Sequence, residues 1–153
     1  MGANRLSAVH QTPGGTGLPI INATGSATIR LGLCHIILGS DATPADVAGE
    51  FVVARTDDAG IGGTALTENL LDPISGAGAI ACVGGTFGTD PASTANGNLL
   101  MIALNQRATF TWWAREGFEL YSALATGDGI MVESTAFSSG TPNMNLTLAW
   151  MEG

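Results

Sequence analysis

The sequence predicts an all-β protein, a jelly-roll-like antiparallel β-sandwich of about eight strands with an extended N-terminal arm. Short segments with an apolar residue at every second position recur from Ser26 to the C-terminus. Segments rich in Gly, Pro, Asp and Thr separate them, as turns do. Helices of about 10–15 residues, which would connect parallel strands, are not indicated anywhere. An immunoglobulin-like sandwich is the alternative, although the Cys…Trp…Cys spacing of that fold is absent.

The chain of 153 residues has the length of one domain. Residues 1–23 have little periodic hydrophobicity and contain Pro13-Gly14-Gly15 and Pro19. This segment is therefore expected to be an extended arm, and residues 24–153 to be a single β-sandwich domain.

Eight strands are expected after the arm. In the first, Ala27, Ile29, Leu31 and Leu33 share one face. The others cover residues 50–55, 77–83, 98–105, 107–114, 118–122, 129–134 and 143–151. The last alternates most clearly, because Met144, Leu146, Leu148 and Trp150 are separated by smaller or polar residues. Only residues 44–49 and 65–71 could be helical, and both are too short to form a layer.

Charge is scarce and acidic. Hydrophobic residues make up 45% of the chain but charged residues only 12%, against about 25% in typical domains. All basic residues are Arg, and the net charge is −8. A nucleic-acid partner is not expected, because no basic surface exists to displace counterions. A membrane span is not expected either, since the longest fully apolar run is residues 99–104.

Two expected strands are apolar on both faces, where a sandwich strand should have one polar face. In residues 98–105, Leu100, Ile102 and Leu104 point to one face, and the residues between them are also apolar. In the next strand, Trp112 and Trp113 are consecutive and so point to different faces. Either a loop or short helix covers the second face, or another subunit does. The candidate interface residues are Leu100, Ile102, Leu104 and Trp113, joined by Pro13, Leu18, Pro19 and Ile20 of the arm.

Residues that could carry chemistry are few and scattered. His10 lies in the arm and His35 inside an apolar strand, so they do not form a metal-binding cluster. Cys34 and Cys82 are expected to be buried free thiols or a single bridge between neighbouring strands. Asp57-Asp58 and the pair Glu116 and Glu119 are expected in solvated turns. No enzyme activity, cofactor or metal is therefore expected.

Four segments resemble the small virion structural proteins of tailed bacteriophages. These are residues 106–120 (QRATFTWWAREGFEL), 127–134 (GDGIMVES), 143–152 (NMNLTLAWME) and 50–68 (EFVVARTDDAGIGGTALTE). The resemblance covers roughly residues 24–152 and lies in strands and turns. The chain departs from the pattern at Arg115-Glu116-Gly117, where Pro is common before the Gly.

The resemblance implies a capsid decoration (cement) protein, or alternatively a tail- or collar-associated module that binds a receptor or carbohydrate. Its implied partners are the major capsid protein and further copies of itself, as a homodimer or homotrimer. The implied location is the outer surface of the capsid. The family offers no individual functional residues to carry over to this sequence.

Overall fold

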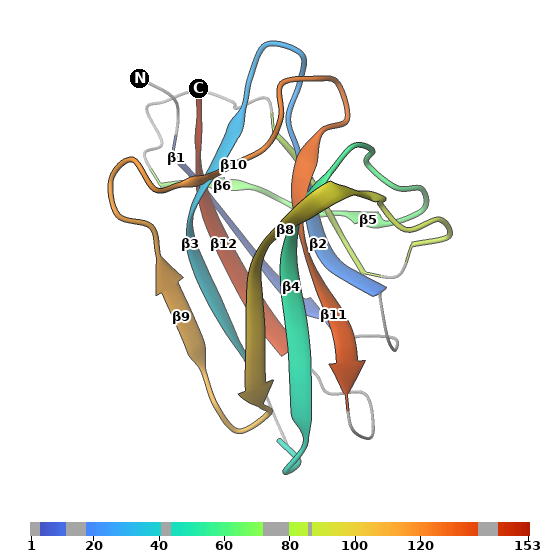
Figure 1. The fold of residues 1–153 in the computed structure, drawn as a ribbon, viewed down its shortest axis with the longest axis vertical. Helices are drawn as coiled ribbons and strands as arrows, with labels where there is room; N and C mark the ends of the chain where they lie inside the picture. The colour runs from blue at the N-terminus through green and yellow to red at the C-terminus, as the bar shows by residue number, and fades with distance from the viewer. Residues whose placement is uncertain (1–3, 12–17, 41–43, 72–79, 86, 138–143) are drawn as a thin grey trace.

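The protein is an all-β sandwich of antiparallel strands in the computed structural model (Figure 1). The structure describes residues 4–11, 18–40, 44–71, 80–85, 87–137 and 144–153. Side chains are described for residues 21–40, 44–71, 80–85, 87–135 and 145–153. Throughout this part of the chain there is no helix.

The strands form two six-stranded sheets. Sheet A runs in the order β10, β3, β12, β1 and β6, and β9 pairs with the same edge of β3 as β10. Its strands are β1 (Asn4–Gln11), β3 (Leu31–Ser40), β6 (Asn69–Leu70), β9 (Phe110–Trp113), β10 (Leu120–Tyr121) and β12 (Met144–Glu152). Sheet B runs in the order β5, β7, β2, β11, β4 and β8. Its strands are β2 (Leu18–Thr24), β4 (Ala48–Thr56), β5 (Thr64–Ala65), β7 (Ala81–Gly84), β8 (Ser93–Asn105) and β11 (Gly129–Phe137).

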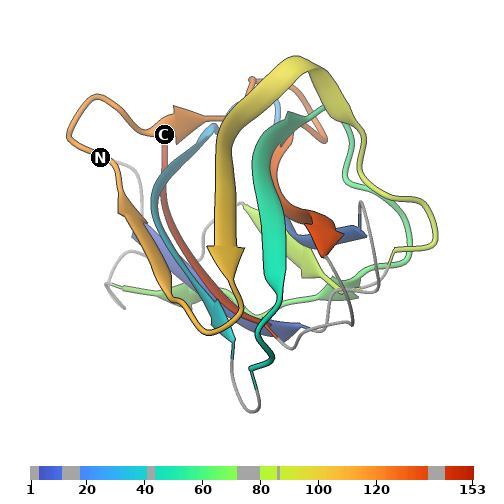
Figure 2. The same ribbon diagram turned by 60° about the horizontal axis from the view of Figure 1, so that its bottom comes forward.

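The hydrophobic core lies between the two sheets, which face one another in Figure 2. Alternation places one set of side chains from each strand inside, as in β12, where Leu146, Leu148 and Trp150 are buried. Phe51 and Val53 of β4 meet them from sheet B. Burial of these large apolar side chains is the main source of stability in such a fold.

The outer face of sheet B holds a second, smaller buried cluster. Val52 and Ala54 of β4 alternate with the core residues of that strand, and Met131 does the same in β11. All three are at most 3% exposed. These three apolar side chains outside sheet B are thus covered within the subunit itself, whereas Met101 of the edge strand β8, opposite Val52 on the same face, is exposed.

An extended N-terminal arm was expected, but the described residues of this segment form strands of the two sheets. Residues 4–11 form β1, which pairs with β12 along its whole length, and residues 18–24 form β2, which pairs with β11 and β7. Pairing satisfies the backbone N–H and C=O groups of each strand without requiring apolar periodicity, so the hydrophobic pattern could not find these strands. Pro13-Gly14-Gly15 lies outside the described residues.

The two stretches that could be helical are not helices. Residues 48 and 49 already belong to β4, and Gln106 Oε1 accepts a hydrogen bond from the backbone N–H of Ala45. Thr64–Ala65 and Asn69–Leu70 are short edge strands. A helix of one or two turns is marginal on its own, whereas pairing to an existing sheet adds hydrogen bonds at once.

Several strands begin or end at other residues than the sequence predicted. The first expected strand begins at Leu31 rather than Ser26, because residues 25–30 make a turn in which Ser26 bridges to Ile29. β8 starts at Ser93, five residues earlier than the sequence indicated. The final strand was placed almost correctly, since β12 covers Met144–Glu152.

Candidate functional site

The outer face of sheet A is formed by alternate residues of β9, β3 and β12. His35 lies opposite Trp113 on one side and Ala149 on the other, and Ile37 lies opposite Thr111 and Thr147. Directly opposed residues of antiparallel strands share a face. These six side chains therefore point away from the core, and we call this surface the outer face of sheet A.

Trp113 and His35 form the centre of this face. Their rings are stacked, with centroids 3.4 Å apart and an angle of 13° between the planes. Trp113 is 65% exposed, whereas His35 beneath it is only 7% exposed. One face of the indole thus covers the imidazole, while most of the Trp113 side chain is exposed to solvent.

The imidazole of His35 is buried without a complete set of partners. Among the described residues no group hydrogen-bonds its Nε2 atom. Burial lowers the pKa of His35 below its ordinary value, since the charged form loses its hydration. The ring is therefore neutral at pH 7 and leaves a polar atom unsatisfied, which costs about 1–3 kcal/mol in typical proteins.

Cys34 stands beside His35 at a bulge where β3 and β12 shift register between Ala149 and Trp150. The Cys34 thiol donates a hydrogen bond of 3.1 Å to the carbonyl oxygen of Ala149. Burial raises the pKa of this thiol, and the negative charge of Glu119 adds to the effect. Cys34 is thus held as a thiol, which is the less nucleophilic form. Cys34 and Cys82 do not form a disulfide, and of the two Cys82 is the one that is fully buried.

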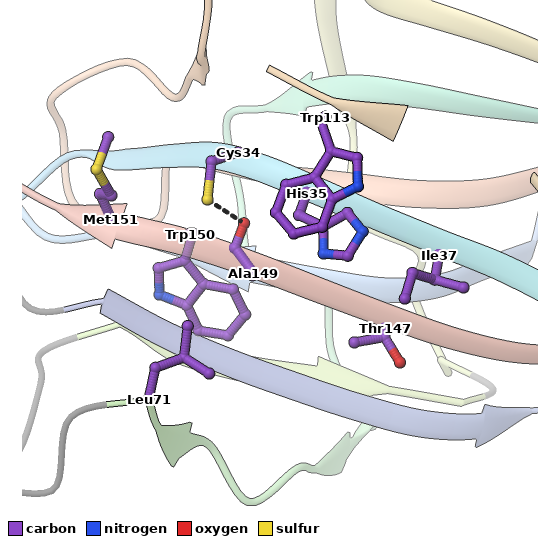
Figure 3. A pocket seen from close by; sticks show the side chains of 9 residues that line it. All are labelled: Cys34, His35, Ile37, Leu71, Trp113, Thr147, Ala149, Trp150 and Met151. Carbon is purple, nitrogen blue, oxygen red and sulfur yellow. Dashed lines mark hydrogen bonds between the residues drawn. The ribbon is translucent and has the colours of Figure 1, made fainter. Parts of the chain in front are cut away.

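A cleft of about 400 Å³ opens on the outer face of sheet A (Figure 3). In Figure 3 the indole of Trp113 lies over His35, and Ile37 and Thr147 lie beyond them. Leu71, which directly follows β6, closes another side and is 57% exposed. The complete lining is Cys34, His35, Ile37, Leu71, Trp113, Thr147, Ala149, Trp150 and Met151.

No Asp, Glu, Lys or Arg side chain lines this cleft, although the chain carries a net charge of −8. The cleft therefore offers apolar contact area with a few hydrogen-bonding groups. Its titratable side chains are His35, which Trp113 covers, and Cys34, whose thiol is hydrogen-bonded to Ala149. A largely apolar cleft with a few polar groups is typical of binding sites.

A second hollow, of about 330 Å³, lies beside the first along the connection from β9 to β10. Trp112, Trp113, Ala114, Arg115 and Phe118 line it. Phe118 is 74% exposed and follows Gly117, whose φ of 81° fits the tight turn. The Gly117 N–H donates to Glu119 Oε1, so this pair of turn residues holds the loop together.

Three of the expected interface residues face the core instead. Ile102 is 3% exposed, and Leu100 and Leu104 are partly buried and pack against the same core cluster. The large apolar side chain of β8 that is exposed is Met101, at 61%. The prediction that Leu100, Ile102 and Leu104 face outward is wrong, because their pairing with β4 places them above Phe51 and Val53.

The other expected interface residues have different outcomes. Trp113 is exposed on the face opposite Trp112, as expected, and Trp112 packs against the core. Pro13 lies outside the described residues. Leu18, Pro19 and Ile20 belong to β2, but their side chains lie outside the described ones.

The sequence contained a signal for the missed part of this face. Residues 31–38 (LGLCHIIL) are apolar at both alternating sets of positions, as residues 99–104 are. The same argument could have placed Ile37 outside, next to Trp113. Leu71 had no comparable signal, because it comes from a different segment.

In the described part of the chain, no group of three or more His, Cys, Asp or Glu residues could hold a metal ion. Within the same residues, no helix is long and apolar enough to cross a membrane. The Asp57-Asp58 turn is exposed, and Asp58 Oδ1 accepts backbone N–H groups of Gly60 and Ala92. This carboxylate thus stabilises a loop.

No protein-family model matches the chain, and no curated protein matches it either.

Proposed function

We propose that this chain is a structural protein of a bacteriophage virion, a decoration protein that binds the outer surface of the expanded capsid and bridges capsomers. The observation that carries the proposal is the outer face of sheet A, which is apolar, uncharged and open around Trp113. Exposed apolar surface with aromatic side chains and few charges is typical of interaction sites. The resemblance of residues 24–152 to small virion proteins directs the proposal to a capsid.

A jelly-roll fold fits this role, and the strand pairing supports it. When β5, β6, β7 and β10 are left out, eight strands remain, of which the first pairs with the last and the second with the seventh. The third pairs with the sixth, and the fourth with the fifth. This nesting matches a jelly roll. In an immunoglobulin-like sandwich the first two strands are neighbours in one sheet, whereas β1 and β2 lie in different sheets here.

The proposed mechanism is stabilisation by many weak contacts. Each copy that binds the expanded shell, and not its precursor, lowers the free energy of the expanded form by mass action. Copies that are linked to one another gain effective concentration on a repeating lattice. The net charge of −8 fits a position on the capsid exterior, away from packaged DNA.

The test is co-sedimentation of the purified full-length chain with empty capsids of the phage that encodes it. We expect the chain to pellet with expanded capsids, to leave unexpanded precursors unbound, and to raise the temperature at which expanded capsids disrupt. If the chain stays in the supernatant with both kinds of capsid, the proposal fails. Truncation of residues 1–23 is not a clean variant, because it removes β1 and most of β2.

A tail- or collar-associated carbohydrate-binding module is the second candidate. The hollow between β9 and β10 favours it, since exposed Trp113 and Phe118 lie near Arg115 there. Aromatic rings beside polar groups are typical of small-molecule sites. Binding of host-surface polysaccharide that is lost in Phe118→Ala, combined with no binding to capsids, would favour this candidate over decoration.

A further inference from the structure

We infer that the outer face of sheet A binds the same face of a second copy of this chain, with Trp113 of each copy packed against the cleft of the other. The inference rests on the proposed function and names the occupant of the face on which that proposal stands. It also replaces the β8 face that the sequence suggested as the interface.

The shape of the outer face of sheet A fits a second copy of the same face. A projection and a hollow lie side by side on this face: Trp113 is 65% exposed and Ile37 36% exposed, next to a cleft of about 400 Å³. A cavity of about 150 Å³ already holds a benzene ring, so an indole fits. Contact between the same face of two copies requires a self-complementary surface, and an adjacent projection and hollow supply it.

The second argument is charge. Two copies that each carry −8 repel one another, so they can approach closely only where the surface is neutral. The cleft of sheet A has no charged lining residue. Sheet B is different, because Glu50 and Glu133 occupy its strands β4 and β11 and are partly exposed. Burial and the charge of Asp90 already raise the pKa of Glu133, and a second acidic surface would oppose its ionisation further.

The third observation is the hydrogen-bonding capacity of the face. Thr111 and Thr147 present hydroxyl groups on it, and each hydroxyl can donate or accept. A second copy brings a further set of these hydroxyls, so the polar groups of this otherwise apolar face can pair across the contact. The unsatisfied His35 Nε2 stays beneath Trp113 in either case, because this atom has almost no exposed surface.

The test is the mass of the chain in solution by sedimentation equilibrium over a range of concentrations. We expect the wild type to have a multiple of 15.5 kDa. Trp113→Glu should reduce the mass to that of one chain, because it places a carboxylate at the centre of the face. Met101→Glu is the matched control, since Met101 is similarly exposed, at 61%, but lies on β8. This variant should retain the wild-type mass.

Circular dichroism must report a folded Trp113→Glu variant; if that variant unfolds, Ile37→Glu takes its place, because Ile37 is already 36% exposed. A wild type that is a single chain at every concentration overturns the inference, and so does an assembly that Met101→Glu alone disrupts. Assembly without capsid binding contradicts the proposed function and leaves the inference standing. Capsid binding by a single-chain wild type contradicts the inference alone.

Discussion

His35 experiences opposing effects within a few ångströms. The indole of Trp113, stacked at 3.4 Å, would attract an imidazolium ion through its π face. The same indole removes water from the ring, which is only 7% exposed, and desolvation disfavours the charged form. Desolvation is the larger effect, because the pKa of His35 is lowered from 6.5. The residue is a neutral, buried part of the surface around it.

This environment predicts an acid-sensitive stability. In the unfolded chain the pKa of His35 returns to about 6.5, so the unfolded state binds the proton more readily than the folded state. The contribution of His35 to folding is therefore intact above this value and is lost as the pH falls below it. We expect the free energy of unfolding, measured in urea, to decrease below pH 6.5 in the wild type.

The matched variant is His35→Phe, which retains an aromatic ring beneath Trp113 but cannot take up a proton. It should lose the part of the pH dependence that begins near 6.5, and it also removes the unsatisfied Nε2 atom. The difference between the two proteins isolates His35 from Glu133, whose raised pKa acts in the opposite direction as the solution becomes acidic. Identical pH profiles for the two proteins would refute this assignment.

At the scale of the element, β8 is the strand that the sequence could not orient. Leu99, Leu100, Met101, Ile102, Ala103 and Leu104 satisfy a core-facing pattern in either phase, and a shift of one residue exchanges the two faces. The register with β4 determines which face of β8 points to the core, since Ile102 is opposite Phe51 and Leu100 is opposite Val53. That register depends on contacts between distant segments and is not contained in the local pattern.

A pair of substitutions tests the orientation of β8. Ile102→Ala should lower the free energy of unfolding by about 2–5 kcal/mol, because it leaves a cavity in the core. Met101→Ala, one residue away and 61% exposed, should change it by no more than about 0.5 kcal/mol. Chemical denaturation of both variants measures the difference. Equal effects, or a larger effect at Met101, would mean that the strand is oriented the other way.

Other elements were predictable to different degrees. β12 was placed within a residue, because its core residues Leu146, Leu148 and Trp150 alternate with small or polar ones. β1 and β2 were missed, since residues 4–11 are held by backbone pairing to β12 and β6 and not by a visible apolar stripe. Trp113 was placed correctly because Trp112 and Trp113 are consecutive in a strand and cannot share a face.

At the scale of the whole molecule, the outer faces of the two sheets differ in which apolar side chains are exposed and in the charges beside them. Outside sheet B, Val52, Ala54 and Met131 are buried within the subunit, while Met101 on the β8 edge is exposed. Outside sheet A, Trp113 and Ile37 are open, and the cleft between them has no charged lining. The outer face of sheet A is therefore one surface where the low content of charged residues is visible. The sequence placed Trp113 on this face but could not assemble the whole of it, since the face combines β3, β9 and β12, which are distant in the chain.

The outer face of sheet A is expected to be covered when copies of the chain meet. Hydroxyl-radical footprinting of the wild type at increasing protein concentration tests this most directly, because it reports the accessibility of individual side chains. We expect Trp113 and Ile37 to become protected together, while Met101, exposed on β8, stays reactive at every concentration. Unchanged labelling of Trp113 across the series, with or without protection of Met101, would contradict the account.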